Sequence, residues 1–179
     1  MVTIKLVQNA TVPVIETGVG NCHTYVDKSA DITMAVDIIA NAKMSRPSVC
    51  NACETLLVHK DVSDDFYSLL DSKFKEKDVK VYASKDILHK LTSVREATDE
   101  DFATEYDDYI VSVGVVDSLD EAISHINKYS TGHSEAIITE NMKNADEFLN
   151  RIDSVAVYVN ASTRFTDGGE FGFGAEIGI

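Results

Sequence analysis

Short apolar runs alternate along this chain with longer amphipathic segments, and this alternation constrains the fold more than any other feature. The apolar runs predict strands over 12–17, 22–27, 54–59, 79–84, 109–118, 135–140 and 155–160. Strands that are buried on both faces are apolar along their whole length, as in parallel sheets whose connecting helices cover both sides. We therefore expect an α/β fold, with an open, mostly parallel sheet flanked by helices.

The segments between the apolar runs carry helical periodicity. They predict helices over 29–43, 63–75, 85–91 and 141–152, and one more helix after Ser118. We expect Ser29 to cap the first helix, and Ser118 to form a capping box with Glu121. In the helix over 63–75, the residues expected to face the core are Phe66, Leu69, Leu70 and Phe74. The acidic stretch 95–109 is expected to be a solvent-exposed loop.

The length of 179 residues fits one domain, 1–179, with a sizeable core. The formal net charge of −14 argues against a nucleic-acid partner and against an anionic membrane surface, because both need basic patches. No apolar run is long enough to span a bilayer, and no secretory signal is visible. Three cysteines are too few for a disulfide framework, so reduced thiols and a cytoplasmic location are expected.

The stretch "ETGVGNCH" (16–23) contains the Gly-x-Gly spacing of a phosphate-binding loop. The dinucleotide fingerprint also needs a third Gly or Ala, followed by a helix. Here His23 stands in that place and a predicted strand follows, and no G-x-x-x-x-G-K-[ST] loop occurs in the chain. The residues alone therefore show no nucleotide-binding signature.

The segment "SRPSVCNACETLLVHK" (45–60) holds two cysteines, Cys50 and Cys53, separated by two residues. As half of a zinc site the pair lacks a second Cys/His pair at a suitable spacing, so no metal is expected. A thioredoxin-like motif opens a helix, whereas here a strand is predicted to follow. Two interpretations remain from the residues alone: buried, unreactive thiols, or one nucleophile, Cys50, in a loop between a helix and a strand.

Four blocks stand out in order along the chain: "VPVIETGVGNCHTYVDKSAD", "NAKMSRPSVCNACETLLVH", "YSTGHSEAIIT" and "VAVYVNASTRFTDGGEFGFGAEIGI". Together they closely resemble the gamma-glutamyl phosphate reductase family, a branch of the aldehyde dehydrogenase superfamily. The resemblance runs from about Val12 to Ile179. It implies the thiol-bearing catalytic domain of that superfamily, and we expect the family's cofactor-binding domain to be absent from this chain.

The resemblance implies an NADPH-dependent reduction of L-glutamyl 5-phosphate to L-glutamate 5-semialdehyde, a step of proline biosynthesis. In that family the cysteine of "RPSVCNA" is the nucleophile, which falls on Cys50. Its thiolate is expected to attack the acyl phosphate and form a thioester, with the backbone N–H of Cys50 helping to hold the oxyanion. NADPH is expected to be bound mainly by the cofactor domain, so the isolated chain is expected to have little or no turnover.

The same resemblance assigns further site residues. Glu16 matches the general-base position of oxidising aldehyde dehydrogenases; because a reductase does not hydrolyse its thioester, Glu16 is also interpreted as a structural or thiol-orienting carboxylate. Glu105 matches a position that meets the nicotinamide ribose, or else is one more charge in an acidic loop. In the loop "NASTRFTDGG" (160–169), which matches the segment that holds the amino-acid end of the substrate, the candidates are Ser162, Thr163 and Arg164 for the α-carboxylate and Asp167 for the α-ammonium group.

Two other interpretations stay open. One is a different superfamily member that acts on another acyl substrate, and the other is a non-catalytic redox module built on the C-x-x-C motif. Cys53 occupies a place that the family usually gives to an aliphatic residue, so it is expected to face the core; a disulfide with Cys50 would silence the nucleophile. The expected partners are L-glutamyl 5-phosphate and the family's cofactor domain, and full-length family members are expected to be homo-oligomers.

Overall fold

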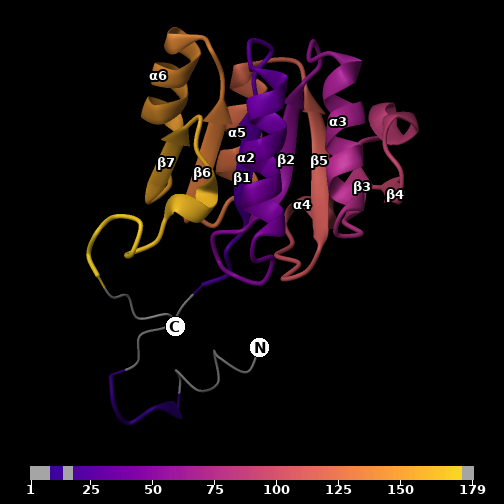
Figure 1. Cartoon of the computed structure of the whole chain (residues 1–179). Helices are drawn as coiled ribbons and strands as arrows, with labels where there is room; N and C mark the ends of the chain where they lie inside the picture. Colours follow the sequence, from indigo (N-terminus) through magenta and orange to yellow (C-terminus); the bar gives the residue numbers. More distant parts are fainter. Residues whose placement is uncertain (1–8, 14–17, 175–179) are drawn as a thin grey trace.

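The computed structural model describes residues 9–13 and 18–174 of the chain (Figure 1). Seven strands form one sheet in the order β4-β3-β5-β2-β1-β6-β7, and every strand pairing within the described residues is parallel. The strands are β1 (Cys22–Val26), β2 (Cys53–His59), β3 (Lys80–Ala83), β4 (Val94–Glu96), β5 (Ile110–Val116), β6 (Ser134–Ile138) and β7 (Ala156–Val159). The expected α/β fold is confirmed.

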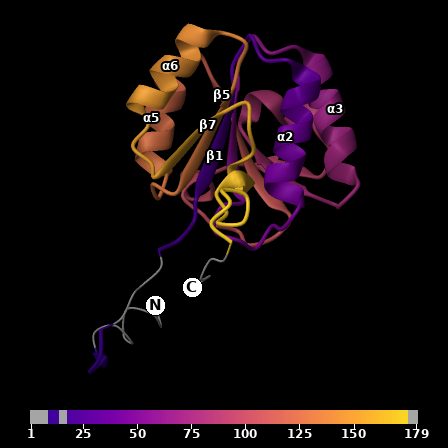
Figure 2. The ribbon, with the colours of Figure 1, turned by 60° about the vertical axis from the view of Figure 1, so that its left-hand side comes forward.

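Helices lie on both faces of the sheet, which gives three layers (Figure 2). The helices are α2 (Ile32–Met44), α3 (Asp64–Lys75), α4 (Asp99–Phe102), α5 (Leu119–Tyr129) and α6 (Met142–Arg151), with 3-10 turns η1 (Lys85–Lys90) and η2 (Thr163–Phe165). Helices α2 and α3 pack on one face, and α5 and α6 on the other. Because the central strands β1 and β2 are covered on both sides, every residue in them is buried, including polar ones such as His23 and Glu54.

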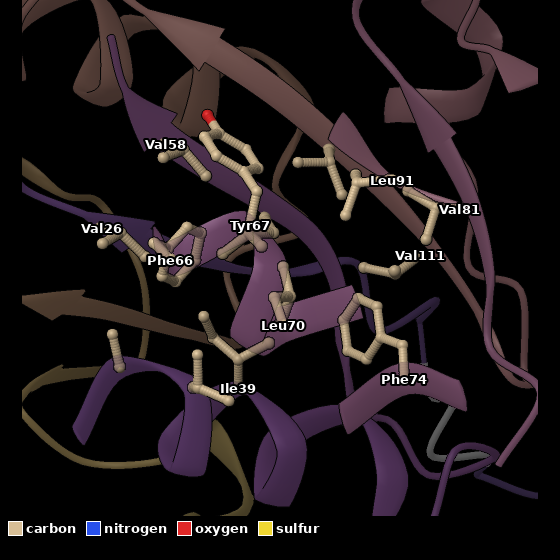
Figure 3. Packing of buried hydrophobic residues seen from close by; sticks show 14 of the residues in the cluster. Val26, Ile39, Val58, Phe66, Tyr67, Leu70, Phe74, Val81, Leu91 and Val111 are labelled. Carbon is tan, nitrogen blue, oxygen red and sulfur yellow. The ribbon is translucent and has the colours of Figure 1, made fainter. Parts of the chain in front are cut away.

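The larger core lies between α2, α3 and the sheet (Figure 3). Phe66, Leu70 and Phe74 of α3 are buried there, as the helical periodicity predicts. The prediction for Leu69 was wrong, because its side chain is 44% exposed while Tyr67 is 2% exposed. The buried face of α3 is therefore turned by part of a turn toward Tyr67, whose ring stacks edge-on against Phe66.

Helix starts follow short polar side chains, but not always the predicted ones. The prediction for Ser29 was wrong: Asp31 caps α2, and its Oδ1 accepts a hydrogen bond from the Met34 N–H at 2.8 Å. Ser118 caps α5 as predicted, accepting from the Glu121 N–H at 3.2 Å. The Glu121 carboxylate accepts from the Asp117 N–H instead of closing the box on Ser118.

The acidic stretch 95–109 is more ordered than the predicted loop. It contains the end of edge strand β4 and the short helix α4, and Asp101 within it is only 7% exposed. Asp101 accepts hydrogen bonds from both terminal nitrogens of Arg95, at 2.6 and 3.0 Å, and from the Thr98 N–H at 2.7 Å. The ion pair lets a carboxylate be buried in an otherwise solvated segment.

The first predicted strand does not start where the sequence indicates. Val12 is 68% exposed and belongs to no strand, and residues 14–17 lie outside the described part of the chain. The sheet in the structure begins with β1.

The topology brings the amino ends of five neighbouring strands together. Strands β5, β2, β1, β6 and β7 are adjacent and parallel, so the segments that enter them meet at one edge of the sheet. At the opposite edge, the carboxyl ends of β1 and β6 are bridged by Asp27, which accepts hydrogen bonds from Ser29, Thr139 and Asn144. Ligands of open α/β sheets usually bind at carboxyl ends, but here the chain's own side chains fill that place between β1 and β6.

Candidate functional site

A cavity of about 590 Å³ lies at the amino edge of the sheet. Its wall includes residues from the segments that enter β1, β2, β5, β6 and β7, among them Cys50, Glu105 and His133. Cys50 is an exposed free cysteine, whereas Cys22 and Cys53 are buried. Of the three thiols, Cys50 is thus the one that a molecule in this cavity can reach.

The backbone of Cys50 packs against the segment that leads into β1. A Cβ placed on Gly20 would lie 2.0 Å from the Cys50 carbonyl oxygen, so only a glycine permits this close approach. The same carbonyl accepts a hydrogen bond from the Cys22 thiol at 3.2 Å. Burial, reinforced by Glu135, raises the pKa of the Cys22 thiol, so Cys22 remains a protonated donor.

Glu105 lies on the other side of the same glycine. Its Oε1 accepts a hydrogen bond from the Gly20 N–H at 2.9 Å. Burial raises the pKa of this carboxyl group, although the Gly20 N–H and the charge of His133 oppose the shift. Cys50 and Glu105, which the resemblance assigns to one site, both line the cavity.

Asn51, the residue after the exposed thiol, ties the Cys50 loop to the chain that follows β7. Its amide donates to the Thr166 carbonyl oxygen at 2.8 Å, and its own backbone carbonyl accepts from the Thr163 hydroxyl at 2.7 Å. Its Oδ1 accepts from Arg164. Asn51 is 4% exposed, and these bonds, one buried and two part-buried, fix one loop against the other.

A chain of hydroxyl groups runs from this junction to the cavity wall at His133. The His133 Nδ1 lies 2.8 Å from the Ser134 hydroxyl, which lies 2.7 Å from the hydroxyl of Thr166. The Tyr158 hydroxyl lies 2.9 Å from the same Thr166 oxygen. Both His133 and Thr166 line the cavity, although the sequence argument singled out neither. The block "YSTGHSEAIIT" contains His133, but only its place in the fold brings it to the cavity that Cys50 also lines.

The residues predicted to bind the amino-acid end of the substrate follow one another in the chain, but not all of their side chains can be reached by a ligand. Ser162 and Arg164 line a second cavity, of about 300 Å³. Thr163 is fully buried and its hydroxyl is bonded to Asn51. Asp167 accepts from the Gly169 N–H at 2.8 Å, within its own turn. Glu16 lies outside the described residues.

Cys53 faces the core, as expected from the resemblance. It is fully buried, its thiol donates to the Thr55 carbonyl oxygen at 3.3 Å, and burial raises its pKa to about 12. A protonated, inaccessible thiol is a poor partner for exchange with Cys50. Within residues 9–13 and 18–174, no cluster of three or more His, Cys, Asp or Glu side chains is arranged to hold a metal, and no helix is long and apolar enough to cross a membrane.

The arrangement is suited to nucleophilic chemistry on an acyl group. An exposed thiol stands at the wall of a cavity large enough for a small molecule, with its backbone held on two sides. Glu105 and the hydroxyl chain supply acceptors and donors at a short distance from the same space. The arrangement therefore offers a thiol and polar groups of the kinds that nucleophilic acyl chemistry uses.

Comparison with known proteins supports the resemblance seen in the sequence. A model of the aldehyde dehydrogenase family matches residues 97–175. A gamma-glutamyl phosphate reductase of Clostridium botulinum is 60% identical over 174 residues, which is 97% of this chain and 42% of that protein. The one from Caldanaerobacter subterraneus is 59% identical over 175 residues and is also covered to 42%. The chain thus spans less than half the length of these relatives.

Solved structures agree. The crystal structure of gamma-glutamyl phosphate reductase from Thermotoga maritima superposes with a TM-score of 0.91 at 54% identity, covering 99% of this chain and 43% of that one. An acetylating aldehyde dehydrogenase from Geobacillus thermoglucosidasius, at 18% identity and a TM-score of 0.71 over 93% of this chain and 46% of that one, shows the shared fold alone. The expected similarity is confirmed, with homology that extends over nearly the whole of this chain.

Proposed function

We propose that this chain, a homologue of part of the gamma-glutamyl phosphate reductases, carries the nucleophile of an NADPH-dependent reductase in proline biosynthesis. The reaction is the conversion of L-glutamyl 5-phosphate to L-glutamate 5-semialdehyde with release of phosphate. The observation that carries the proposal is Cys50, an exposed thiol on a cavity wall, within a sequence 60% identical to such an enzyme. The part of the relatives that this chain does not span is proposed to supply most of the NADPH site.

The proposed chemistry begins with the Cys50 thiolate. Its sulfur attacks the carbonyl carbon of the acyl phosphate, a C–S bond forms, and the C–O bond to phosphate breaks to leave a thioester on Cys50. The backbone N–H of Cys50 is the proposed donor to the oxyanion. Gly20 and Cys22 hold the Cys50 carbonyl, which belongs to the peptide unit after the donor, so the loop is held on that side of Cys50 before the substrate arrives.

NADPH would supply the hydride that reduces the thioester, and Glu105 is the residue of this chain proposed to hold its nicotinamide ribose. The fit is chemically reasonable because Glu105 is a half-buried carboxylate on the cavity wall, and carboxylates accept hydrogen bonds from ribose hydroxyls. The hydrogen bond from the Gly20 N–H orients the carboxylate relative to the Cys50 loop.

The substrate's amino-acid end is proposed to lie toward the second cavity, where Ser162 and Arg164 can reach its α-carboxylate. Asp167 is the proposed partner of its α-ammonium group. Thr163 is assigned a positioning role instead, since its hydroxyl is buried and bonded to the Asn51 carbonyl. Glu16 stays a prediction as a thiol-orienting or structural carboxylate.

The test is a single-turnover experiment on this chain. L-Glutamyl 5-phosphate, generated in situ by a kinase, should release one equivalent of phosphate and leave a glutamyl adduct on Cys50, detected by peptide mass spectrometry. Cys50→Ser should abolish the adduct and reduce phosphate release to the rate of spontaneous cyclisation measured without protein, and Cys53→Ser should keep both signals. Phosphate release above that rate without an adduct on Cys50, or an adduct on Cys53, would contradict the proposal. With NADPH added, the isolated chain is expected to show little or no steady-state turnover.

Arg164 separates this proposal from the interpretation that the chain acts on another acyl substrate. Arg164→Gln should slow the reaction of glutamyl phosphate about tenfold or more, because a charge-assisted contact is lost, while leaving that of acetyl phosphate nearly unchanged. Equal effects on both donors would favour a different substrate class.

A further inference from the structure

The cavity beside Cys50 is lined by negative charge. Glu105 and Asp107 both contribute to its wall. The whole chain carries a formal charge of −14. An acyl phosphate that enters this cavity therefore meets a field that opposes its own charge.

His133 is the exception in this wall. Among the described residues that line the cavity, it alone has a side chain that can carry a positive charge, since none of the others is Lys, Arg or His. Burial raises the pKa of Glu105, and His133 is among the groups that oppose this rise, so the imidazole lies within electrostatic reach of that carboxylate. A departing phosphate needs a proton or a hydrogen-bond donor, and an imidazole can supply either near neutral pH.

The hydroxyl chain orients this imidazole. Its Nδ1 is paired with the Ser134 hydroxyl at 2.8 Å, and Ser134 is held in turn by Thr166 and, through Thr166, by Tyr158. The Thr166 backbone is joined to Asn51, the residue next to the nucleophile. With one ring nitrogen used in this way, Nε2 is left to meet a ligand in the cavity. The imidazole and the Cys50 loop are thus parts of one hydrogen-bonded framework.

We propose that His133 is a catalytic residue that donates a proton through Nε2 to the phosphate as it leaves the acyl group. This inference rests on the proposed function and names the group that serves its leaving phosphate. In the step, the C–S bond to Cys50 forms and the C–O bond breaks, with its electron pair leaving on the phosphate oxygen. The phosphate gains the His133 proton, and the proton lost by the Cys50 thiol balances it, through solvent.

The proposal is tested by changing the leaving group. Two acyl donors, acetyl phosphate and 4-nitrophenyl acetate, would each acylate Cys50, but nitrophenolate departs without a proton whereas phosphate needs one. Acylation is followed by phosphate or nitrophenolate release, and the adduct on Cys50 by mass spectrometry. His133→Asn is the chosen variant, because its amide can keep the bond to Ser134 while Nε2 is lost. His89→Asn, at an exposed position in η1, is the matched control.

His133→Asn should slow acylation by acetyl phosphate about 100-fold, the lower range for loss of a general acid, and change that by 4-nitrophenyl acetate less than about threefold. An equal decrease in the acylation rate with both donors would overturn the proposal, because His133 would then affect the reactivity of the Cys50 thiol or the stability of the fold. No loss with acetyl phosphate would overturn it equally. If His133→Asn fails to fold by circular dichroism, His133→Gln takes its place with the same expectation of donor-selective loss.

Failure of the proposed function has a different signature. Wild-type protein that is acylated by 4-nitrophenyl acetate but never by acetyl phosphate or glutamyl phosphate would overturn the acyl phosphate chemistry, and the role of His133 with it. Wild-type protein that reacts with both donors, alongside an unaffected His133→Asn, would overturn the role of His133 alone.

Discussion

Gly20 and Cys50 lie backbone against backbone, so close that a Cβ on Gly20 would be 2.0 Å from the Cys50 carbonyl oxygen and 2.6 Å from its Cα. The second glycine of "GVGNC" is thus needed for this close approach of the two backbones. Through its N–H, Gly20 also orients Glu105. One residue without a side chain therefore sets the spacing between the proposed nucleophile and the proposed ribose ligand.

Gly20→Ala should displace the Cys50 loop, because neither backbone can give way by that distance. We expect a loss of about 1–3 kcal/mol in the free energy of unfolding, as for other overpacked sites, and at least a tenfold slower acylation of Cys50. Urea unfolding and the adduct assay measure the two effects. Gly18→Ala is the matched control for stability, since a Cβ there meets nothing within 4 Å. Equal stabilities of the two variants would contradict the steric argument.

Asn51→Ala should loosen the junction between the Cys50 loop and the chain after β7. It removes the amide that donates to the Thr166 carbonyl and the acceptor of Arg164, two part-buried bonds of a side chain that is itself buried. The expected loss is about 1–3 kcal/mol in the free energy of unfolding. Asn150→Ala, which removes an exposed amide bonded to the Asp146 carbonyl, should cost less than about 0.5 kcal/mol. Similar costs for both would show that Asn51 is not a structural junction.

The three thiols should differ clearly in their rates of alkylation. Iodoacetamide is expected to modify Cys50 in the folded protein while Cys22 and Cys53 stay unmodified, since both are buried and burial raises the pKa of each thiol. In urea all three should react. Cys53→Ala should leave the rate at Cys50 unchanged within about twofold. Modification of Cys53 in the folded state at a rate near that of Cys50 would revive the C-x-x-C redox interpretation.

The stability of the protein should depend on pH through His125. Burial, together with the charges of His23 and Lys128, lowers the pKa of His125 to about 3, well below the value of about 6.5 in an unfolded chain. In that interval the unfolded state binds a proton that the folded state does not, so this stabilising contribution is present above pH 6.5 and is lost as the pH falls. The neutral ring packs against Phe102 and Tyr129.

His125→Phe should remove that dependence. At pH 8 the variant and the wild type should differ only by packing, by less than about 1.5 kcal/mol. Below pH 6.5 their difference should shift in favour of the variant by up to about 1.4 kcal/mol per pH unit. Urea unfolding at pH 8, 6 and 5 measures this shift. Parallel stability curves for the two proteins would contradict the assignment.

The sequence predicted those elements whose burial leaves a pattern of apolar residues, and it missed those that depend on packing. Apolar runs located the central strands because β1 and β2 are buried on both faces. The polar edge strand β4 carries no such signal and was missed. Leu69 was misplaced because two apolar neighbours, Tyr67 and Leu69, compete for one helical face and only packing decides between them.

The residues of the candidate site also divide into those that the sequence could indicate and those that only the fold reveals. Cys50 and Glu105 were both assigned from their places in the resembling sequence, because the local motif left Cys50 open between a buried thiol and a nucleophile. Asn51 and His133 have no local signal, because their partners lie in other segments: Asn51 bonds to Thr166, and His133 reaches the cavity that Cys50 also lines only through the order of strands β2, β1 and β6. A motif search cannot give contacts that depend on how distant segments are paired.

The hydrogen bonds that frame the cavity also bear on the order in which the molecule folds. Gly20 with Glu105, Asn21 with Thr131, and Asn51 with Thr166 join residues 85, 110 and 115 positions apart. Contacts across such long loops form late and slowly, because chain entropy must be lost before they contribute. Helical signal should therefore return early during refolding, and Cys50 should regain its native reactivity only after the last strand has joined the sheet.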